Sequence, residues 1–129
     1  MTDLVCTEML ILHCTKTYIT MNMDRHLKRI MTKFRFDVSE LSVHYYRYRS
    51  HAEKDLKCPL CGEAKEDEVH FVLCCPMLDD RKQFITPKFC KHPCLFRLSL
   101  LLASTNQEIV RKLSIFLYKA FTIRDTVTA

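Results

Sequence analysis

The chain has 129 residues, which is enough for one domain with a single core and too few for the usual two-domain enzyme. Apolar residues make up 48% of the chain and charged residues 27%, and Gly62 is the only glycine, so the composition predicts a mainly helical fold. The net charge is +5, and basic flanks surround an acidic middle segment, residues 58–80. Basic flanks attract phosphate groups, although a run of charges more often only solvates a surface.

We expect neither an export signal nor a membrane-spanning segment. Residues 1–14 begin with an acid where an export signal carries basic residues. The longest strongly apolar run, residues 98–103, is far below the roughly 20 residues that cross a bilayer. The sequence therefore predicts an intracellular protein, nuclear or cytoplasmic, without a membrane partner. In such a compartment, clustered Cys and His bind metal more often than they form disulfides.

The first predicted element is a basic helical arm, residues 20–57, which follows an unassigned segment, residues 1–19. Apolar side chains recur at helical spacing from Met23 to Phe34. The basic side chains fall on the opposite side of this helix and are predicted to face solvent or a phosphate backbone: Arg25, Lys28, Arg29, Lys33 and Arg35.

A second helical segment, capped by Ser39, is predicted to complete this arm. Tyr46, Arg47 and Arg49 lie near its end in the stretch HYYRYR. An aromatic ring between arginines can stack on a base while the arginines bind phosphates. We therefore expect these three residues to face a nucleic acid, together with four basic residues of the first helix: Arg25, Lys28, Arg29 and Lys33.

Helices are also predicted for residues 77–129, after the cysteine-rich segment. A short helix is expected over residues 78–85. A second segment, residues 95–103 with Pro93 in its first turn, is apolar on nearly every face and is expected to be buried. The last helix starts at the cap Asn106, runs to about residue 124 and has one apolar face: Ile109, Leu113, Phe116, Leu117, Ala120 and Ile123.

The segment between arm and helices, residues 58–76, has the ligand types of a structural zinc site. Cys58 and Cys61 are separated by two residues, so one tight turn can present both thiolates to a single ion. Gly62 directly follows and can take the positive φ that such a turn needs. His70 supplies a third ligand, and all four positions would be filled by protein, which leaves no open position for catalysis. The acids at 66–68 are expected to form an exposed loop.

The fourth ligand is either Cys74 or Cys75. His70 and Cys74 are four residues apart and would share one face of an ideal helix. Pro76, however, pushes residue 75 out of the helical region and can turn that thiol toward the metal. Because zinc sites accept both spacings, geometry alone leaves the choice open.

This segment resembles the zinc-binding module that lies C-terminal to the reverse transcriptase of non-LTR (LINE-type) retrotransposons. The likeness is carried by Cys58-Pro59-x-Cys61-Gly62, Glu68-x-His70-Phe71, Cys75-Pro76 and Arg81. In that family the last cysteine immediately precedes a proline. The resemblance therefore implies the ligands Cys58, Cys61, His70 and Cys75, with Zn²⁺ as the metal.

The resemblance also implies a function. It indicates a retroelement-derived zinc-binding module that binds RNA or DNA weakly and has no catalysis of its own, since polymerase and nuclease motifs are absent from the sequence. Two alternatives stay open. Zinc can stabilise a structural domain that contacts a polymerase or another protein, or the chain can be a nonfunctional retrotransposon remnant. The predicted fold is a helical arm, an inserted small zinc-binding module and a C-terminal helical pair.

Overall fold

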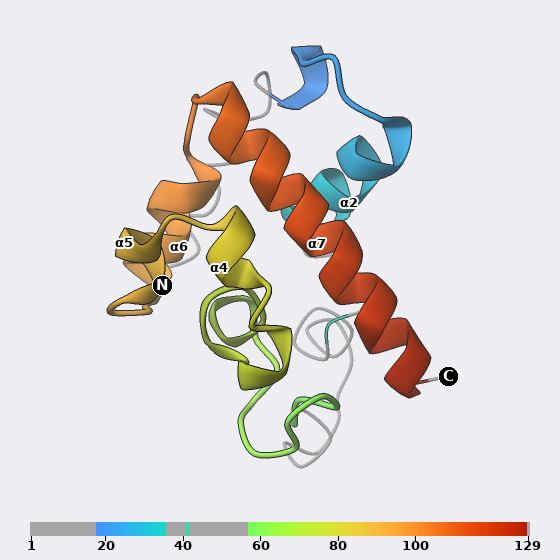
Figure 1. Cartoon of the computed structure of the whole chain (residues 1–129), viewed down its shortest axis with the longest axis vertical. Helices are drawn as coiled ribbons and strands as arrows, with labels where there is room; N and C mark the ends of the chain where they lie inside the picture. The colour runs from blue at the N-terminus through green and yellow to red at the C-terminus, as the bar shows by residue number, and fades with distance from the viewer. Residues whose placement is uncertain (1–17, 36–40, 42–56, 129) are drawn as a thin grey trace.

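A computed structural model describes residues 18–35, 41 and 57–128 of the chain. The described part is mainly helical, as predicted (Figure 1). It contains no strand, only an isolated antiparallel bridge between Lys57 and Lys65. Its helical elements are α2 (Arg25–Arg35), the π-helical turn η2 (His70–Cys74), the 3-10 turn η3 (Pro76–Leu78), α4 (Arg81–Phe84), α5 (Pro87–Cys90), α6 (Leu95–Leu102) and α7 (Gln107–Thr128). None of these helices is long and apolar enough to cross a membrane.

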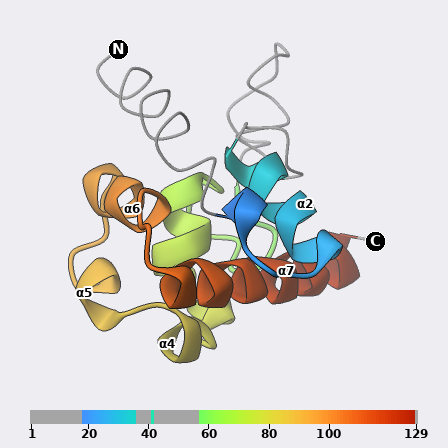
Figure 2. The ribbon, with the colours of Figure 1, turned by 90° about the horizontal axis from the view of Figure 1, so that it is seen from above.

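Helix α7 is the longest described element, and both α2 and α4 pack on it. The Asn106 side chain caps it, because Oδ1 accepts hydrogen bonds from the backbone N–H groups of Glu108 (2.9 Å) and Ile109 (3.3 Å). The helix continues to Thr128, one turn beyond the predicted end. α2 packs on one side of it and α4 on the other, as seen in Figure 1 and again from above in Figure 2.

Packing on two sides changes which residues of α7 are buried. Leu113, Phe116, Leu117 and Ala120 are buried as predicted. Ile123, predicted to lie on the same face, is 38% exposed, whereas Phe121 is buried. A single apolar stripe was therefore the wrong description, because a helix with neighbours on two sides buries a wider arc than a helix with one neighbour.

Helix α2 confirms the predicted amphipathic element but corrects one of its basic residues. Met31 and Phe34 are buried, as the apolar spacing predicts. Arg35, predicted on the basic side, is also buried: its guanidinium donates a 2.6 Å hydrogen bond to the carbonyl of Leu102 and lies 5.0 Å from the ring centroid of Tyr18. A carbonyl acceptor and an aromatic face are both favourable neighbours for a buried guanidinium.

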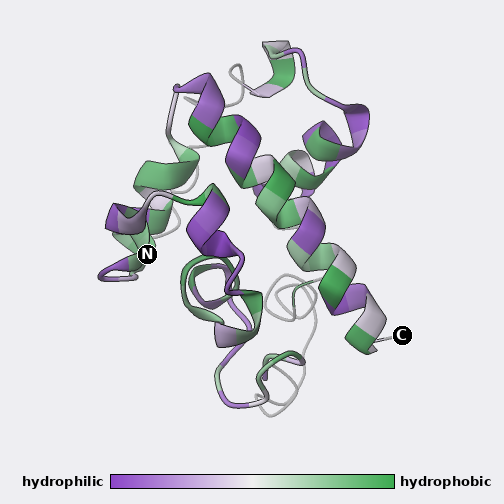
Figure 3. Cartoon of the chain, viewed as in Figure 1, coloured by the Kyte–Doolittle hydropathy of each residue, from purple (hydrophilic) through white to green (hydrophobic). Residues whose placement is uncertain are grey.

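The region after the cysteine-rich segment is more broken than predicted. The helix expected over residues 78–85 is divided into η3 and α4, because residues 79 and 80 form a turn between them. Pro93 lies before α6 rather than in its first turn. α6 itself, largely apolar in Figure 3, buries Leu98 and Leu101 only.

The remaining apolar side chains of α6 correct a further prediction. Phe96 is 71% exposed and Leu100 is 48% exposed. The prediction that this apolar segment is buried is therefore wrong for these two side chains and right for Leu98 and Leu101. α6 packs chiefly against α5, which is too short to cover more than one side of it.

The cysteine-rich segment is built into the main core. Phe71, Val72 and Leu73 of η2 are buried, and the ring of Phe71 lies 4.7 Å from that of Phe121 on α7, measured between centroids. The candidate metal site therefore sits at the junction between its own loop and the longest helix.

Candidate metal centre

The first pair of cysteines lies on one tight turn. The backbone N–H of Cys58 donates to the carbonyl of Ala64 (2.7 Å), and that of Gly62 donates to the carbonyl of Cys58 (2.8 Å). Gly62 has φ 71°, the left-handed conformation that its sequence position predicts. The turn points the backbone N–H groups of Glu63 and Ala64 toward the sulfur of Cys61, which lowers the pKa of that thiol.

The second half of the site is a helical turn of unusual pitch. Asp67 starts it, since its Oδ1 accepts a 2.8 Å hydrogen bond from the backbone N–H of His70. At the other end, the backbone N–H of Cys75 donates to the carbonyl of His70 (2.7 Å), five residues back, so η2 is a π-helical turn. A π turn holds one residue more than an α turn, and such turns are often found at functional sites.

This turn decides between the two candidate cysteines. In an α-helix His70 would share a face with Cys74, whereas the wider turn brings Cys75 beside His70. Cys74 is exposed and lies outside the cluster, while Cys75 is buried within it. The cluster therefore contains Cys75, the cysteine that the resemblance implies, and not Cys74, which an ideal α-helix would place beside His70.

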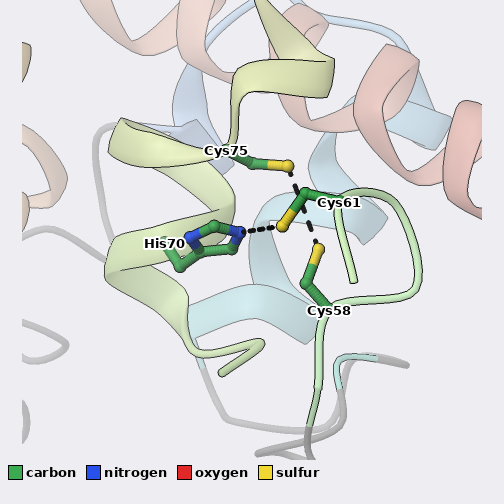
Figure 4. A group of neighbouring side chains, drawn as sticks. All are labelled: Cys58, Cys61, His70 and Cys75. Atoms are coloured by element: carbon green, nitrogen blue, oxygen red, sulfur yellow. Dashed lines mark hydrogen bonds between the residues drawn. The ribbon is translucent and has the colours of Figure 1, made fainter. Parts of the chain in front are cut away.

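The four predicted ligands converge. One ligand atom from each of Cys58, Cys61, His70 and Cys75 lies within 4.8 Å of all the others. Figure 4 shows the side chains pointing toward a common centre, with 3.9 Å between the sulfurs of Cys58 and Cys75 and 3.4 Å between the sulfur of Cys61 and Nε2 of His70. Three thiols and an imidazole within this space form a cluster that could hold a metal ion.

Burial and backbone contacts shift the pKa values of these groups in opposite directions. Burial raises the pKa of the Cys58 thiol, and it raises the pKa of the Cys75 thiol to about 12. Burial also lowers the pKa of His70. Without a metal the two buried sulfurs therefore hold their protons, and the imidazole is neutral and able to donate a lone pair.

Arg81 holds the end of the π turn in place. Its buried guanidinium donates hydrogen bonds to the carbonyls of Cys75 (2.6 Å), Val72 (3.0 Å) and Phe71 (3.4 Å), and it lies 5.8 Å from the ring centroid of Phe116. Carbonyls at the end of a helix have no partners within it, so a cation with several donors is well suited to this position. The resemblance included Arg81 in its motif but assigned it no role.

Glu66 corrects the prediction of an exposed acidic loop. Its side chain is fully buried, and its two carboxylate oxygens accept hydrogen bonds from Nε and Nη2 of Arg124, both at 2.8 Å. This bidentate ion pair connects the loop between the two halves of the site to the last turns of α7. Neither residue was predicted to take part in the site, because 58 residues separate them and no local pattern relates them.

The predicted nucleic-acid residues divide into three groups. Arg25, Arg29 and Lys33 are exposed on α2, whereas Lys28 is half-buried and its ammonium donates a 2.8 Å hydrogen bond to the carbonyl of Ile19. Tyr46, Arg47 and Arg49 lie outside the described residues, as does the helix predicted after Ser39.

Comparisons with protein-family models, with curated proteins and with solved structures gave no significant match. Function has therefore to be inferred from the site and the surface of this chain.

Proposed function

We propose that the chain is a zinc-stabilised module that binds nucleic acid through the basic side of α2 and carries out no catalysis itself. The observation that carries the proposal is the convergence of four protein donors, three sulfurs and one nitrogen, within 4.8 Å. Structural zinc sites have this donor set, and soft thiolates select zinc over the hard cations that prefer oxygen. With four protein ligands, zinc has no open position for a reacting water.

The spacing of the donors supports zinc. Zinc binds sulfur at about 2.3 Å and imidazole nitrogen at about 2.0 to 2.1 Å, so a tetrahedral site separates two sulfurs by about 3.8 Å and a sulfur from a nitrogen by about 3.6 Å. The corresponding separations are 3.9 Å for Cys58 and Cys75, and 3.4 Å for Cys61 and His70. These two pairs are close to the separations of a tetrahedral zinc site, and all four ligand atoms lie within 4.8 Å of one another.

The balance of charges around the site also supports zinc as the bound ion. Three thiolates and one Zn²⁺ carry a net charge of −1, which is costly to bury without a counterion. The guanidinium of Arg81 is buried next to the site and donates to the carbonyl of Cys75 itself. This arrangement compensates the charge of the loaded site.

The nucleic-acid part of the proposal is supported by the exposed cations of α2. Arg25, Arg29 and Lys33 lie on the side of the helix opposite the buried Met31 and Phe34. Three cations along one side of a helix can each neutralise a phosphate and release its counterion. Their contacts carry no base sequence information, so the binding is weak and sequence-independent.

Salt dependence tests this proposal. For three phosphate contacts on a single strand, the logarithm of the binding constant falls against the logarithm of salt concentration with a slope of about −2. Arg29→Gln is expected to reduce the magnitude of this slope by about 0.7. The matched control is Lys82→Gln on α4, an exposed lysine on the other side of α7 from α2 (Figure 2), which leaves the slope unchanged. Salt-independent binding, or no binding by the zinc-loaded protein, would refute the proposal.

A second function, contact with a polymerase or another protein, is favoured by one observation. Phe96 and Leu100 are four residues apart on α6 and are 71% and 48% exposed. Such a pair forms a small apolar patch of the kind found at protein interfaces. Replacing Phe96 with Asp separates the two functions, since it would abolish a protein contact there and leave salt-dependent nucleic-acid binding intact.

A further inference from the structure

We infer that the ring of Tyr118 on α7, with His26 of α2 beside it, is a stacking site for an unpaired base of a single strand bound along α2. The inference rests on the proposed function and specifies the form of its ligand. It assigns a site to two residues that lie 92 positions apart and that the sequence did not bring together.

The two rings meet where α2 packs on α7. The ring centroids of His26 and Tyr118 are 6.4 Å apart, with 42° between their planes. Leu117 and Phe121, neighbours of Tyr118 on α7, are buried, yet Tyr118 is 45% exposed. Its ring is therefore positioned by the helix pair while part of its surface stays open to solvent.

Phosphate-binding groups lie along the same side of α2. Arg29 and Lys33 follow His26 by three and seven residues, so they continue its side of the helix, and Arg25 precedes it. From Arg25 to Lys33 the helix rises by about 12 Å. Phosphates of one strand repeat at about 3.4 Å in a duplex and farther apart when stretched, so this length suits about three of them.

The charges around Tyr118 give the strand a direction. Asp125 lies seven residues after Tyr118, two turns along the same side of α7, and its carboxylate repels phosphate. Arg111 lies seven residues before Tyr118, and its guanidinium donates to the carbonyl of Asn22, in the segment just before α2, at 3.3 Å. The strand is therefore expected to run from Tyr118 over the cations of α2 and not along α7 toward Asp125.

A partly exposed aromatic ring beside a helix that carries cations fits a single strand better than a duplex. Bases of a duplex are stacked on one another and their faces are not available, whereas each base of a single strand has a free face. Stacking one base is typically worth about 1 to 3 kcal/mol, or about 5- to 150-fold in affinity.

The chain has no tryptophan, so a single one introduced in place of Tyr118 is a specific reporter. We expect the fluorescence of the zinc-loaded Tyr118→Trp variant to be quenched when a short oligothymidylate is added, because a base stacks on the indole. The control is Phe96→Trp, at a position that is 71% exposed on α6, and its fluorescence should not change.

Affinity gives an independent readout. Tyr118→Ser should weaken oligothymidylate binding about tenfold and leave duplex binding unchanged, while Tyr118→Phe should bind within about twofold of wild type. No binding by the wild-type protein would refute the proposed function itself. Normal binding by wild type, with no quenching in Tyr118→Trp and no loss in Tyr118→Ser, would overturn only the stacking site.

Discussion

Breaking the ion pair between Glu66 and Arg124 should destabilise the protein, and replacing the arginine should destabilise it more than replacing the glutamate. Arg124→Met removes two charged hydrogen-bond donors from a carboxylate that is fully buried. Loss of one member of a buried pair costs about 3 to 5 kcal/mol, because the remaining charge is left in a poorly solvated place. The arginine side chain is 9% exposed and lies in the last turns of α7, where water can enter. We therefore expect Arg124→Met to lower the free energy of unfolding by about 3 kcal/mol, at the lower end of this range.

Replacing the glutamate instead of the arginine should lower the free energy of unfolding by a smaller amount. In Glu66→Leu the arginine is left without this partner, but it is long, flexible and near the surface, so its head group can reach water. We expect a loss of about 1 to 2 kcal/mol. The double variant Glu66→Leu/Arg124→Met leaves no unpaired charge and should be within about 1 kcal/mol of wild type.

The assay is guanidinium unfolding followed by far-UV circular dichroism, with zinc in excess over protein throughout. The control is the exposed pair formed by Glu108 and Lys112, with 3.1 Å between the carboxylate oxygen and the ammonium nitrogen. Glu108→Gln should change the free energy of unfolding by less than about 0.5 kcal/mol. If Arg124→Met costs no more than this control, or the double variant is as unstable as the single one, the buried pair does not hold the loop against α7.

Three further changes test the turn, the cap and the chemistry of the ligands. Gly62→Ala should lower the free energy of unfolding by about 1 kcal/mol, because an added Cβ meets no neighbouring atom and only the positive φ is unfavourable. Asparagine tolerates this φ, so Gly62→Asn should lower the free energy of unfolding by less, as measured in the same denaturant titration. Asn106→Ala should cost about 1 kcal/mol through loss of the cap on α7 and reduce helical ellipticity. Zinc affinity, measured against a chelating dye, should fall at least about 100-fold from about pH 7 to about pH 6. Because the pKa values of Cys58 and Cys75 are raised, each thiol must release a proton to bind zinc, and binding therefore weakens as pH falls. The lowered pKa of His70 keeps its imidazole neutral, so this residue releases no proton. A zinc affinity that does not depend on pH would contradict this reasoning.

The helical class and the ligand cluster were accessible from the sequence because both depend on local patterns. Cys58 and Cys61 are joined by one turn, and the one glycine of the chain marks where that turn needs a positive φ. The choice of Cys75 was correct as to which thiol joins the cluster. The π turn that brings it there was not predicted, since Pro76 indicated a break after residue 75 but not the pitch before it.

Tertiary contacts account for what the sequence could not predict. Charge patterns place Glu66 and Arg35 at the surface, but each finds a partner from a distant part of the chain, Arg124 in one case and the carbonyl of Leu102 in the other. The exposure of Phe96 likewise depends on how little of α6 its neighbours cover. Hydrophobic periodicity identifies a helix but does not indicate how many elements pack around it.

Metal analysis of two neighbouring cysteine variants tests the central claim most directly. Cys75→Ser removes a buried donor of the cluster, whereas Cys74→Ser changes an exposed thiol one residue away. We predict that wild type and Cys74→Ser each purify with about one zinc per chain. Cys75→Ser should lose zinc and stability together, because the free energy of metal binding is part of the free energy of folding. Equal zinc content in the two variants would contradict the assignment of the site.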